Sequence, residues 1–255
     1  RILHYFDYVL YDFPLQRQIL NMKPELFAIL TLLSPLASDS LITNGNFEDV
    51  SGTFPNAWTT TPTPAAVAGI VAGSATAAEL QTGEGIHQDF APTPGSGLFN
   101  FQLDLAFRTS VAPANDGNIN RIRLRGDNNA GDLITLSLED AGIRSFSGTW
   151  ADDLTGVSIS ANTTYFLRVT GSNLDLPGRA FTLGFSTDGV NYTTATPSTR
   201  FHIAPVGTAF ETLRLEGLNA TFTVDNVSVV PEAATSTLLA AGLLLLRSFG
   251  CARRK

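Results

Sequence analysis

Hydrophobic and polar residues alternate with a period of two along much of the chain between residues 41 and 230. The clearest stretch runs from Phe99 to Phe107, where phenylalanine or leucine occupies every second position. Successive side chains of a β-strand point to opposite faces, so this pattern predicts strands with one buried and one solvated face. No stretch here has a convincing 3.6-residue period, and the pattern therefore predicts an all-β fold. Similar stretches recur at residues 121–125, 133–138, 165–170, 181–185 and 213–217.

Two local features refine this prediction. Asp188-Gly189 supplies the positive φ angles of a tight turn and predicts a hairpin. The last apolar stretch, residues 221–230, has its apolar residues at even positions at first and at odd positions later. A β-bulge at Asp225-Asn226 would return them all to one face. Several short strands separated by turns, within 190 residues, predict a two-sheet jelly-roll β-sandwich over residues 41–230.

Charge is distributed unevenly along the sequence. The 255 residues contain 16 Lys+Arg and 23 Asp+Glu, which gives a net charge of −7. Residues 41–230 contain nine Arg, no Lys and 18 Asp+Glu, so the predicted domain has a net charge near −9. Such an acidic domain is not expected to bind nucleic acid or anionic lipid. The only cysteine, Cys251, lies outside this region, so no disulfide can form within the chain.

Residues 22–40 have the three parts of a signal peptide. Met22-Lys23 gives a short positive start, an apolar run of eight residues follows, and small residues lead to cleavage after Ala37 or Ser40. This segment predicts an N-terminal signal helix and passage through the Sec export machinery. A buried hydrophobic helix is the alternative. Residues 1–21 precede the only methionine and are interpreted as an upstream segment, for which no fold is predicted.

The C-terminal end carries a second hydrophobic segment. Residues 237–252 are rich in leucine, alanine and glycine, and basic residues follow them. A helix of this length covers about 24 Å, whereas a full membrane span needs about 20 residues, or about 30 Å. The prediction is a short C-terminal hydrophobic helix that acts as a marginal membrane anchor. Basic residues at its end would remain cytoplasmic and leave residues 41–230 outside, in agreement with the signal peptide.

Residues 231–255 resemble the PEP-CTERM sorting signal of Gram-negative bacteria. The resemblance lies in Val230-Pro231-Glu232, the short apolar helix and the terminal basic cluster. It implies that exosortase, a membrane cysteine transpeptidase, recognises Pro231 and Glu232 and cleaves near them. It also implies an inner-membrane-tethered precursor and a mature protein at the cell surface or in the extracellular matrix. An ordinary membrane anchor is the alternative. The residues assigned as the stop of the signal are Arg253, Arg254 and Lys255.

Two further motifs resemble the first and last strands of carbohydrate-binding-module-like jelly rolls. They are residues 41–48, with Trp58 downstream, and residues 222–227. In those modules a glutamate of the first motif and an aspartate of the last often surround a structural Ca²⁺. The resemblance implies Glu48 and Asp225 as calcium ligands, with Asn46 as a weaker candidate. In the alternative interpretation Glu48 caps a turn and Asp225 accepts hydrogen bonds from the bulge backbone. The resemblance also places Trp58 in the core.

Few residues of the predicted domain suit catalysis. A glycoside hydrolase needs two carboxylates about 5–10 Å apart across a sugar ring. Glu139-Asp140 and Asp152-Asp153 are adjacent in sequence, and neighbours on a strand point to opposite faces. The domain contains only His87 and His202 and no cysteine, which excludes a His/Cys zinc site. No catalytic residue is predicted, and a secreted β-sandwich glycoside hydrolase is the alternative function.

Candidate ligand-binding residues are arginines and aromatic residues. Arginines at alternate positions on one strand face could bind an acidic polysaccharide through bidentate contacts, unless they pair with carboxylates such as Asp104 or Glu216. Trp150 and Tyr192 could form a sugar-stacking platform, whereas burial in the core is the alternative. The expected function is non-catalytic: polysaccharide binding, or a structural role in the exopolysaccharide layer. The arginines are Arg121, Arg123 and Arg125.

Overall fold

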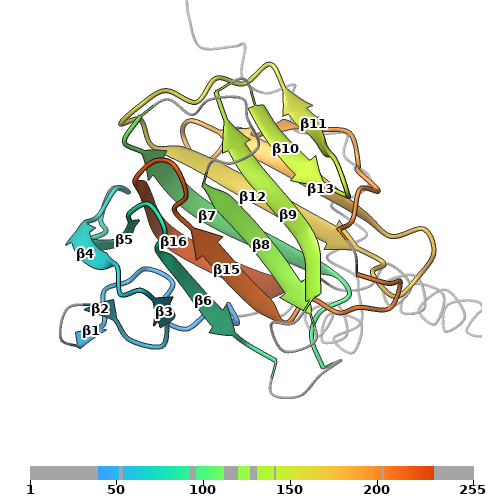
Figure 1. Cartoon of the computed structure of the whole chain (residues 1–255), viewed down its shortest axis with the longest axis horizontal. Helices are drawn as coiled ribbons and strands as arrows, with labels where there is room; N and C mark the ends of the chain where they lie inside the picture. Colours follow the sequence, from blue (N-terminus) through green and yellow to red (C-terminus); the bar gives the residue numbers. More distant parts are fainter. Residues whose placement is uncertain are drawn as a thin grey trace, which may run out of the picture. The chain divides into compact units, whose positions relative to one another are not determined.

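The structure, a computed structural model, describes residues 40–51, 54–91, 96–111, 120–126, 131–140, 142–202 and 204–232. Two antiparallel sheets of seven strands form a β-sandwich, which confirms the predicted jelly-roll fold (Figure 1). The predicted signal helix and C-terminal hydrophobic helix lie outside the described residues. Within the described residues, no helix is long and apolar enough to cross a bilayer.

Each sheet has its own strand order. Sheet I is β11 (Trp150–Thr155), β10 (Gly142–Phe146), β9 (Gly131–Glu139), β8 (Arg121–Gly126), β15 (Thr212–Glu216), β6 (Gly85–Asp89) and β3 (Thr59–Thr61). Sheet II is β14 (Thr193–Thr194), β13 (Ala180–Ser186), β12 (Tyr165–Ser172), β7 (Phe101–Thr109), β16 (Phe222–Pro231), β5 (Thr76–Leu80) and β4 (Ala65–Ala68). A small hairpin joins β1 (Val50–Ser51) to β2 (Phe54–Pro55).

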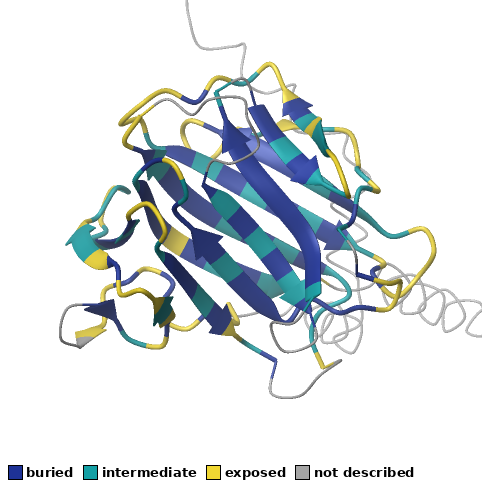
Figure 2. Ribbon diagram, in the orientation of Figure 1, coloured by how far each residue is buried: buried dark blue, intermediate teal, exposed yellow. Residues whose placement is uncertain are grey.

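The hydrophobic core lies between the two sheets and follows the predicted alternation. On β7 the side chains of Phe101, Leu103, Leu105 and Phe107 are buried, and polar residues between the first three are half-buried. Buried and intermediate positions also alternate along β8 and β12 (Figure 2). Leu213 and Leu215 of β15 are fully buried as well. Burial of this apolar surface is the main driving force for the association of the two sheets.

The predicted bulge in the last strand is confirmed. The register between β16 and β7 shifts between Asp225 and Ser228, and Asn226 has a φ angle of 47°. Because the bulge adds one residue on β16, Val224 and Val227 are both buried despite their opposite parity. Asp225 of the bulge is fully buried and lies opposite Ala106 of β7 in the register.

The first described residues lie along the last strand. The Leu41 backbone N–H donates to the Val229 carbonyl at 2.7 Å, and the Val227 N–H donates to the Gly45 carbonyl at 2.8 Å. Trp58 is buried, as predicted, and its ring centre lies 5.3 Å from that of the fully buried Phe47. The first and last motifs of the domain therefore lie side by side.

Candidate functional site

The outer face of sheet I carries the three arginines of β8. Ile122 and Leu124 of this strand are fully buried, so Arg121, Arg123 and Arg125 point away from the core and are half-buried. The strand register places them beside polar residues of both neighbouring strands, which are β9 and β15. Figure 2 shows the result as alternating buried and intermediate positions on β8.

The arginines take part in a continuous chain of ion pairs across three strands. Asp132 Oδ1 lies 2.7 Å from Arg125 Nε, and Asp132 Oδ2 lies 3.1 Å from Arg123 Nη1. Glu216 Oε2 lies 2.8 Å from Arg123 Nε, and Glu216 Oε1 lies 2.7 Å from Arg214 Nε. We call Arg125, Asp132, Arg123, Glu216 and Arg214 the ion-pair chain. Arg123 therefore pairs with Glu216, as the alternative interpretation of the sequence proposed. The site is partly buried, so salt screens this ion pair less than it screens a pair at the surface.

Asp104, the other carboxylate considered as a partner, lies on sheet II. It accepts hydrogen bonds from Arg168 Nε at 2.7 Å and Arg168 Nη2 at 3.2 Å, and it does not pair with the arginines of β8. Arg168 also lies over the Tyr192 ring, 4.4 Å from its centre. Since Leu167 and Val169 are fully buried, Arg168 and Tyr192 belong to the outer face of sheet II.

A row of three rings lies next to the ion-pair chain on sheet I. The ring centres of Trp150 and Phe146 are 5.2 Å apart, and those of Phe146 and His202 are 5.0 Å apart. All three side chains are half-buried, and His202 Nδ1 lies 3.4 Å from Asp132 Oδ2. Arg200 Nη2 donates to the Thr149 carbonyl at 2.6 Å. This bond holds the segment that contains Arg200 and His202 beside the turn that precedes Trp150. We call Trp150, Phe146 and His202 the ring row.

Arg121 connects the ring row to the arginines. Its guanidinium carbon lies 5.6 Å from the centre of the Trp150 ring, although β9 and β10 separate their strands. Both side chains therefore lean over the sheet. Ser137 of β9 lies opposite Arg121 in the register and is fully buried. Burial and the nearby Arg123 charge lower the pKa of Arg121.

The structure separates the two aromatic residues that the sequence predicted as one platform. Trp150 lies on the outer face of sheet I, where it meets Arg121, whereas Tyr192 lies on the outer face of sheet II. Phe146 and His202 take the place of Tyr192 beside Trp150. The contact between Phe146 and Trp150 could have been predicted from the sequence, because the short turn containing Gly148 pairs the two residues. His202 belongs to a segment far away in the sequence.

Glu48 and Asp225 meet at the opposite edge of the sandwich, around the Ser74 hydroxyl. Ser74 Oγ lies 3.1 Å from Glu48 Oε1 and 3.1 Å from Asp225 Oδ1. It also lies 2.9 Å from the Thr76 carbonyl oxygen. Asn46, the weaker candidate, is exposed and takes no part in these contacts.

Backbone groups hold both carboxylates, in agreement with the alternative interpretation of these residues. The Ala75 N–H donates to Glu48 Oε1 at 2.6 Å, and this bond is the main cause of a lowered Glu48 pKa. The Ile70 N–H donates to Asp225 Oδ2 at 3.0 Å, and the Asn226 N–H of the bulge donates to Asp225 Oδ1 at 2.8 Å. Burial nevertheless raises the pKa of Asp225, because desolvation disfavours the ionised form.

The chemistry of this cluster suits a hard cation. A hydroxyl has one hydrogen, so Ser74 cannot donate to all three of the acceptor oxygens that surround it. Two carboxylates, a hydroxyl and a carbonyl are the oxygen donors that Ca²⁺ prefers. Among the described residues no group of three His, Cys, Asp or Glu side chains comes together in a way that could hold a metal ion.

Asn44, which sequence reasoning did not select, shapes the loop before Glu48. Its Nδ2 donates to the carbonyls of Asp49 at 2.7 Å and Asn56 at 3.0 Å, and its Oδ1 accepts from the Asp49 N–H at 3.0 Å. Its φ angle is 52°, a left-handed conformation that asparagine tolerates better than most residues. The Asn-Gly pair at residues 44 and 45 was the sequence feature that could have indicated this turn.

The first residues of the predicted sorting motif belong to the folded domain. Pro231 ends β16 opposite Phe101, and the Glu232 N–H donates to the Asn100 carbonyl at 3.1 Å. Of the other residues assigned to targeting, only Ser40, the last of 22–40, is described; residues 1–21, the rest of 22–40 and the basic cluster Arg253, Arg254 and Lys255 lie outside the described residues.

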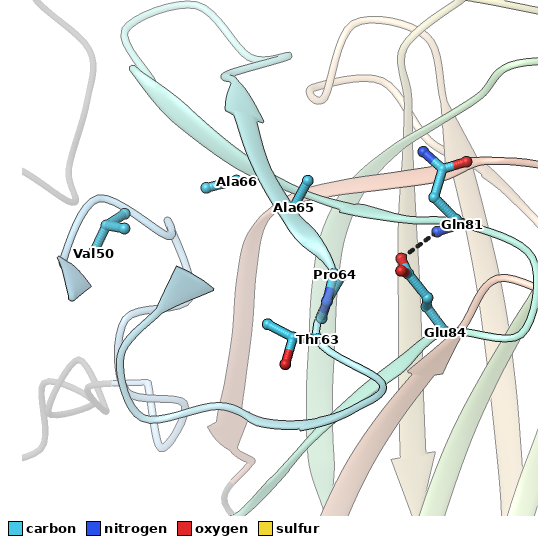
Figure 3. A pocket seen from close by; sticks show the side chains of 7 residues that line it. All are labelled: Val50, Thr63, Pro64, Ala65, Ala66, Gln81 and Glu84. Atoms are coloured by element: carbon cyan, nitrogen blue, oxygen red, sulfur yellow. Dashed lines mark hydrogen bonds between the residues drawn. The ribbon is translucent and has the colours of Figure 1, made fainter. Parts of the chain in front are cut away.

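Figure 3 shows a depression of about 620 Å³ near the edge strand β4. Its only charged lining side chain, Glu84, accepts a hydrogen bond from the Gln81 N–H at 2.7 Å. Neither an aromatic ring nor an arginine lines it, in contrast to the outer face of sheet I. Its lining residues are Val50, Thr63, Pro64, Ala65, Ala66, Gln81 and Glu84.

No protein-family model matches the chain, and no curated protein matches its sequence. Solved structures share its fold. A carbohydrate esterase from the Shiga toxin-encoding bacteriophage phi24B is 13% identical, with a TM-score of 0.53, and the match covers 77% of this chain and 100% of that one. At this identity the likeness shows the fold alone.

Two further structures match with lower TM-scores. Domain 4 of AbnA, a GH43 extracellular arabinanase from Geobacillus stearothermophilus in complex with arabinotriose, is 17% identical, with a TM-score of 0.45 and coverage of 79% of this chain and 94% of that one. The exoplasmic/lumenal domain of VIP36, in a Ca²⁺/Man2-bound form, is 11% identical, with a TM-score of 0.46 and coverage of 76% and 89%.

Proposed function

We propose that this protein is an exported, non-catalytic polysaccharide-binding protein, whose binding face is the outer face of sheet I. The ring row carries the proposal: three half-buried rings, with centres 5.2 and 5.0 Å apart and planes inclined by 56° and 65°, offer aromatic surface to sugar rings. The adjoining ion-pair chain offers donors and acceptors for sugar hydroxyls. A carbohydrate esterase with the same fold supports a sugar-related function.

The carboxylates of this face support binding rather than hydrolysis. Glu139 lies 3.4 Å from Arg144, and Asp132 and Glu216 each lie within 3.1 Å of two arginines. A glycosidase needs two carboxyl groups that face the sugar ring. These three carboxylates face arginine side chains, so their contacts favour a role in holding the face together.

Affinity electrophoresis on gels that contain polysaccharides tests the proposal. We expect the purified protein to be retarded by at least one polymer of a broad panel. Trp150→Ala should abolish the retardation. The matched control is Tyr192→Ala, which removes a half-buried ring stacked on an arginine of the opposite face and should leave retardation unchanged. Failure of every polymer to retard the protein would exclude binding and favour a structural role in the exopolysaccharide layer.

A structural Ca²⁺ is part of the proposal. Glu48, Asp225, the Ser74 hydroxyl and the Thr76 carbonyl would hold it, and the ion would neutralise two carboxylates that share one hydroxyl. Because these groups come from both ends of the domain, a bound cation would fasten the first segment to the last strand. The ion would have a structural role, and its site lies away from the ring row.

The sorting motif completes the proposal. An exosortase would read Pro231 and Glu232 at the end of β16, after Sec-dependent export and tethering in the inner membrane of a Gram-negative bacterium. Mass spectrometry of the surface or matrix protein should find a C-terminus near Glu232. Surface protein that retains Lys255 would instead support an ordinary membrane anchor.

A further inference from the structure

We infer that the polysaccharide bound by the outer face of sheet I is carboxylated, a uronate-containing polymer; this inference rests on the proposed function. The first observation is the distribution of positive charge. Six of the nine arginines between residues 41 and 230 lie on this face or at its rim, although the region has 18 acidic residues and no lysine. The six are Arg121, Arg123, Arg125, Arg144, Arg200 and Arg214.

The second observation is that two carboxylates contact three arginines at the centre of this face. Asp132 and Glu216 pair with Arg123, Arg125 and Arg214, and both contact Arg123. Towards the edge of the sheet, Arg144 contacts both Glu139 and Asp152. A guanidinium group carries five N–H donors in a planar fork. A carboxylate from a ligand has the geometry and charge that complement such a fork, whereas a neutral hydroxyl provides one acceptor without charge.

The third observation is the position of Arg121 between the ring row and the ion-pair chain. Its guanidinium lies 5.6 Å from the Trp150 ring centre, and the nearby positive charge of Arg123 helps to lower its pKa. An anionic group at this point would lie beside two cations in a partly buried setting, where charge interactions are strong. A uronate ring stacked on Trp150 would bring its carboxylate within reach of Arg121.

Carboxyl reduction provides the direct test, because it removes the charge of a polymer and keeps its sugar backbone. Polygalacturonate, alginate and polyglucuronate would each be compared with its carboxyl-reduced form in affinity electrophoresis. We expect at least one acidic form to bind about tenfold more tightly than its reduced form, as for a hydrogen bond to a charged group. Added salt should weaken binding of the acidic form.

Variants locate the effect on Arg121. Arg121→Gln should weaken binding of the acidic polymer about tenfold, and Arg121→Lys should bind with an intermediate affinity, because it keeps the charge and loses the planar fork. Arg168→Gln, on the outer face of sheet II, is the matched control and should bind as the unaltered protein does. Unfolding midpoints confirm that each variant is folded, and Arg121→Lys carries the test if Arg121→Gln does not fold.

The outcomes separate the two proposals. Equal binding of an acidic polymer and its reduced form, or binding of neutral polymers only, would overturn the carboxylate inference and keep the proposed polysaccharide binding. Unchanged acidic-polymer binding by both Arg121 variants would also overturn the inference. Failure of every polymer in the panel to bind would overturn the proposed function together with it.

Discussion

Gly45 lies so close to Val227 that a Cβ atom on Gly45 would overlap the Val227 carbonyl oxygen. The same residues are joined by the hydrogen bond from the Val227 N–H to the Gly45 carbonyl, at 2.8 Å. Real Cβ atoms do not approach a carbonyl oxygen this closely. The first segment can therefore lie along β16, and bring Glu48 towards Asp225, because residue 45 has no side chain.

Gly45→Ala is expected to lower the free energy of unfolding by about 3 kcal/mol, because the methyl group displaces the first segment from β16. Urea unfolding of the unaltered and variant proteins measures the change. Gly178→Ala is the control, since no atom lies within 4 Å of its Cβ position, and it should change stability by less than about 0.5 kcal/mol. Equal midpoints for both variants would contradict the close approach.

Calcium is expected to raise the melting temperature of the protein. At a concentration of about 100 times its dissociation constant, a ligand that binds only the folded state adds about 2.7 kcal/mol of stability. Asp225→Asn should remove this response, while Asp175→Asn, an exposed aspartate of another loop, should keep it. Thermal unfolding in calcium and in chelator measures both. An Asp225→Asn variant that still responds fully to calcium would show that the ion binds elsewhere.

Two substitutions at Asn44 separate its backbone role from its side-chain role. Asn44→Gly removes three hydrogen bonds and still accepts the φ angle of 52°, whereas Asn44→Ala loses the bonds and must adopt a disfavoured conformation. We expect Asn44→Ala to be less stable than Asn44→Gly by about 1 kcal/mol. Urea unfolding decides the order, and an alanine variant more stable than the glycine variant would contradict the left-handed conformation.

Stability is expected to fall as the pH drops below about 6.5. Burial lowers the pKa of both His202 and His87, so the folded protein binds their protons more weakly than the unfolded chain does. Protonation therefore favours the unfolded state, progressively from the unfolded pKa down to the lowered folded pKa. His202→Gln should lose less stability than the unaltered protein between about pH 7.5 and about pH 5.5. Urea unfolding at both pH values measures the difference, and identical slopes would contradict it.

Most of the fold could be predicted because strand formation has a local signature. The side chains of Phe101, Leu103 and Leu105 point to one face wherever their strand lies, so alternation alone identifies the buried face. The bulge at Asp225 and Asn226 was also predictable, because a single inserted residue leaves a change of parity in the sequence.

The candidate sites were predictable only where their residues are close in sequence or share one strand. The β8 arginines share a face because they alternate on one strand. The ring row needed a hairpin contact between Phe146 and Trp150 and a distant contact from His202. Likewise, Ser74 lies 26 residues from Glu48 and 151 residues from Asp225, so no local pattern marks it as the residue between them.

The sequence by itself determined an acidic, lysine-free, all-β domain, its last-strand bulge and the outward direction of Arg121. Only the tertiary structure decided that Trp150 lies with Arg121 on sheet I and that Tyr192 lies with Arg168 on sheet II. The reason is physical. The direction of a side chain depends on its own strand, whereas its neighbours depend on strand order, which is fixed by packing between segments far apart in the chain.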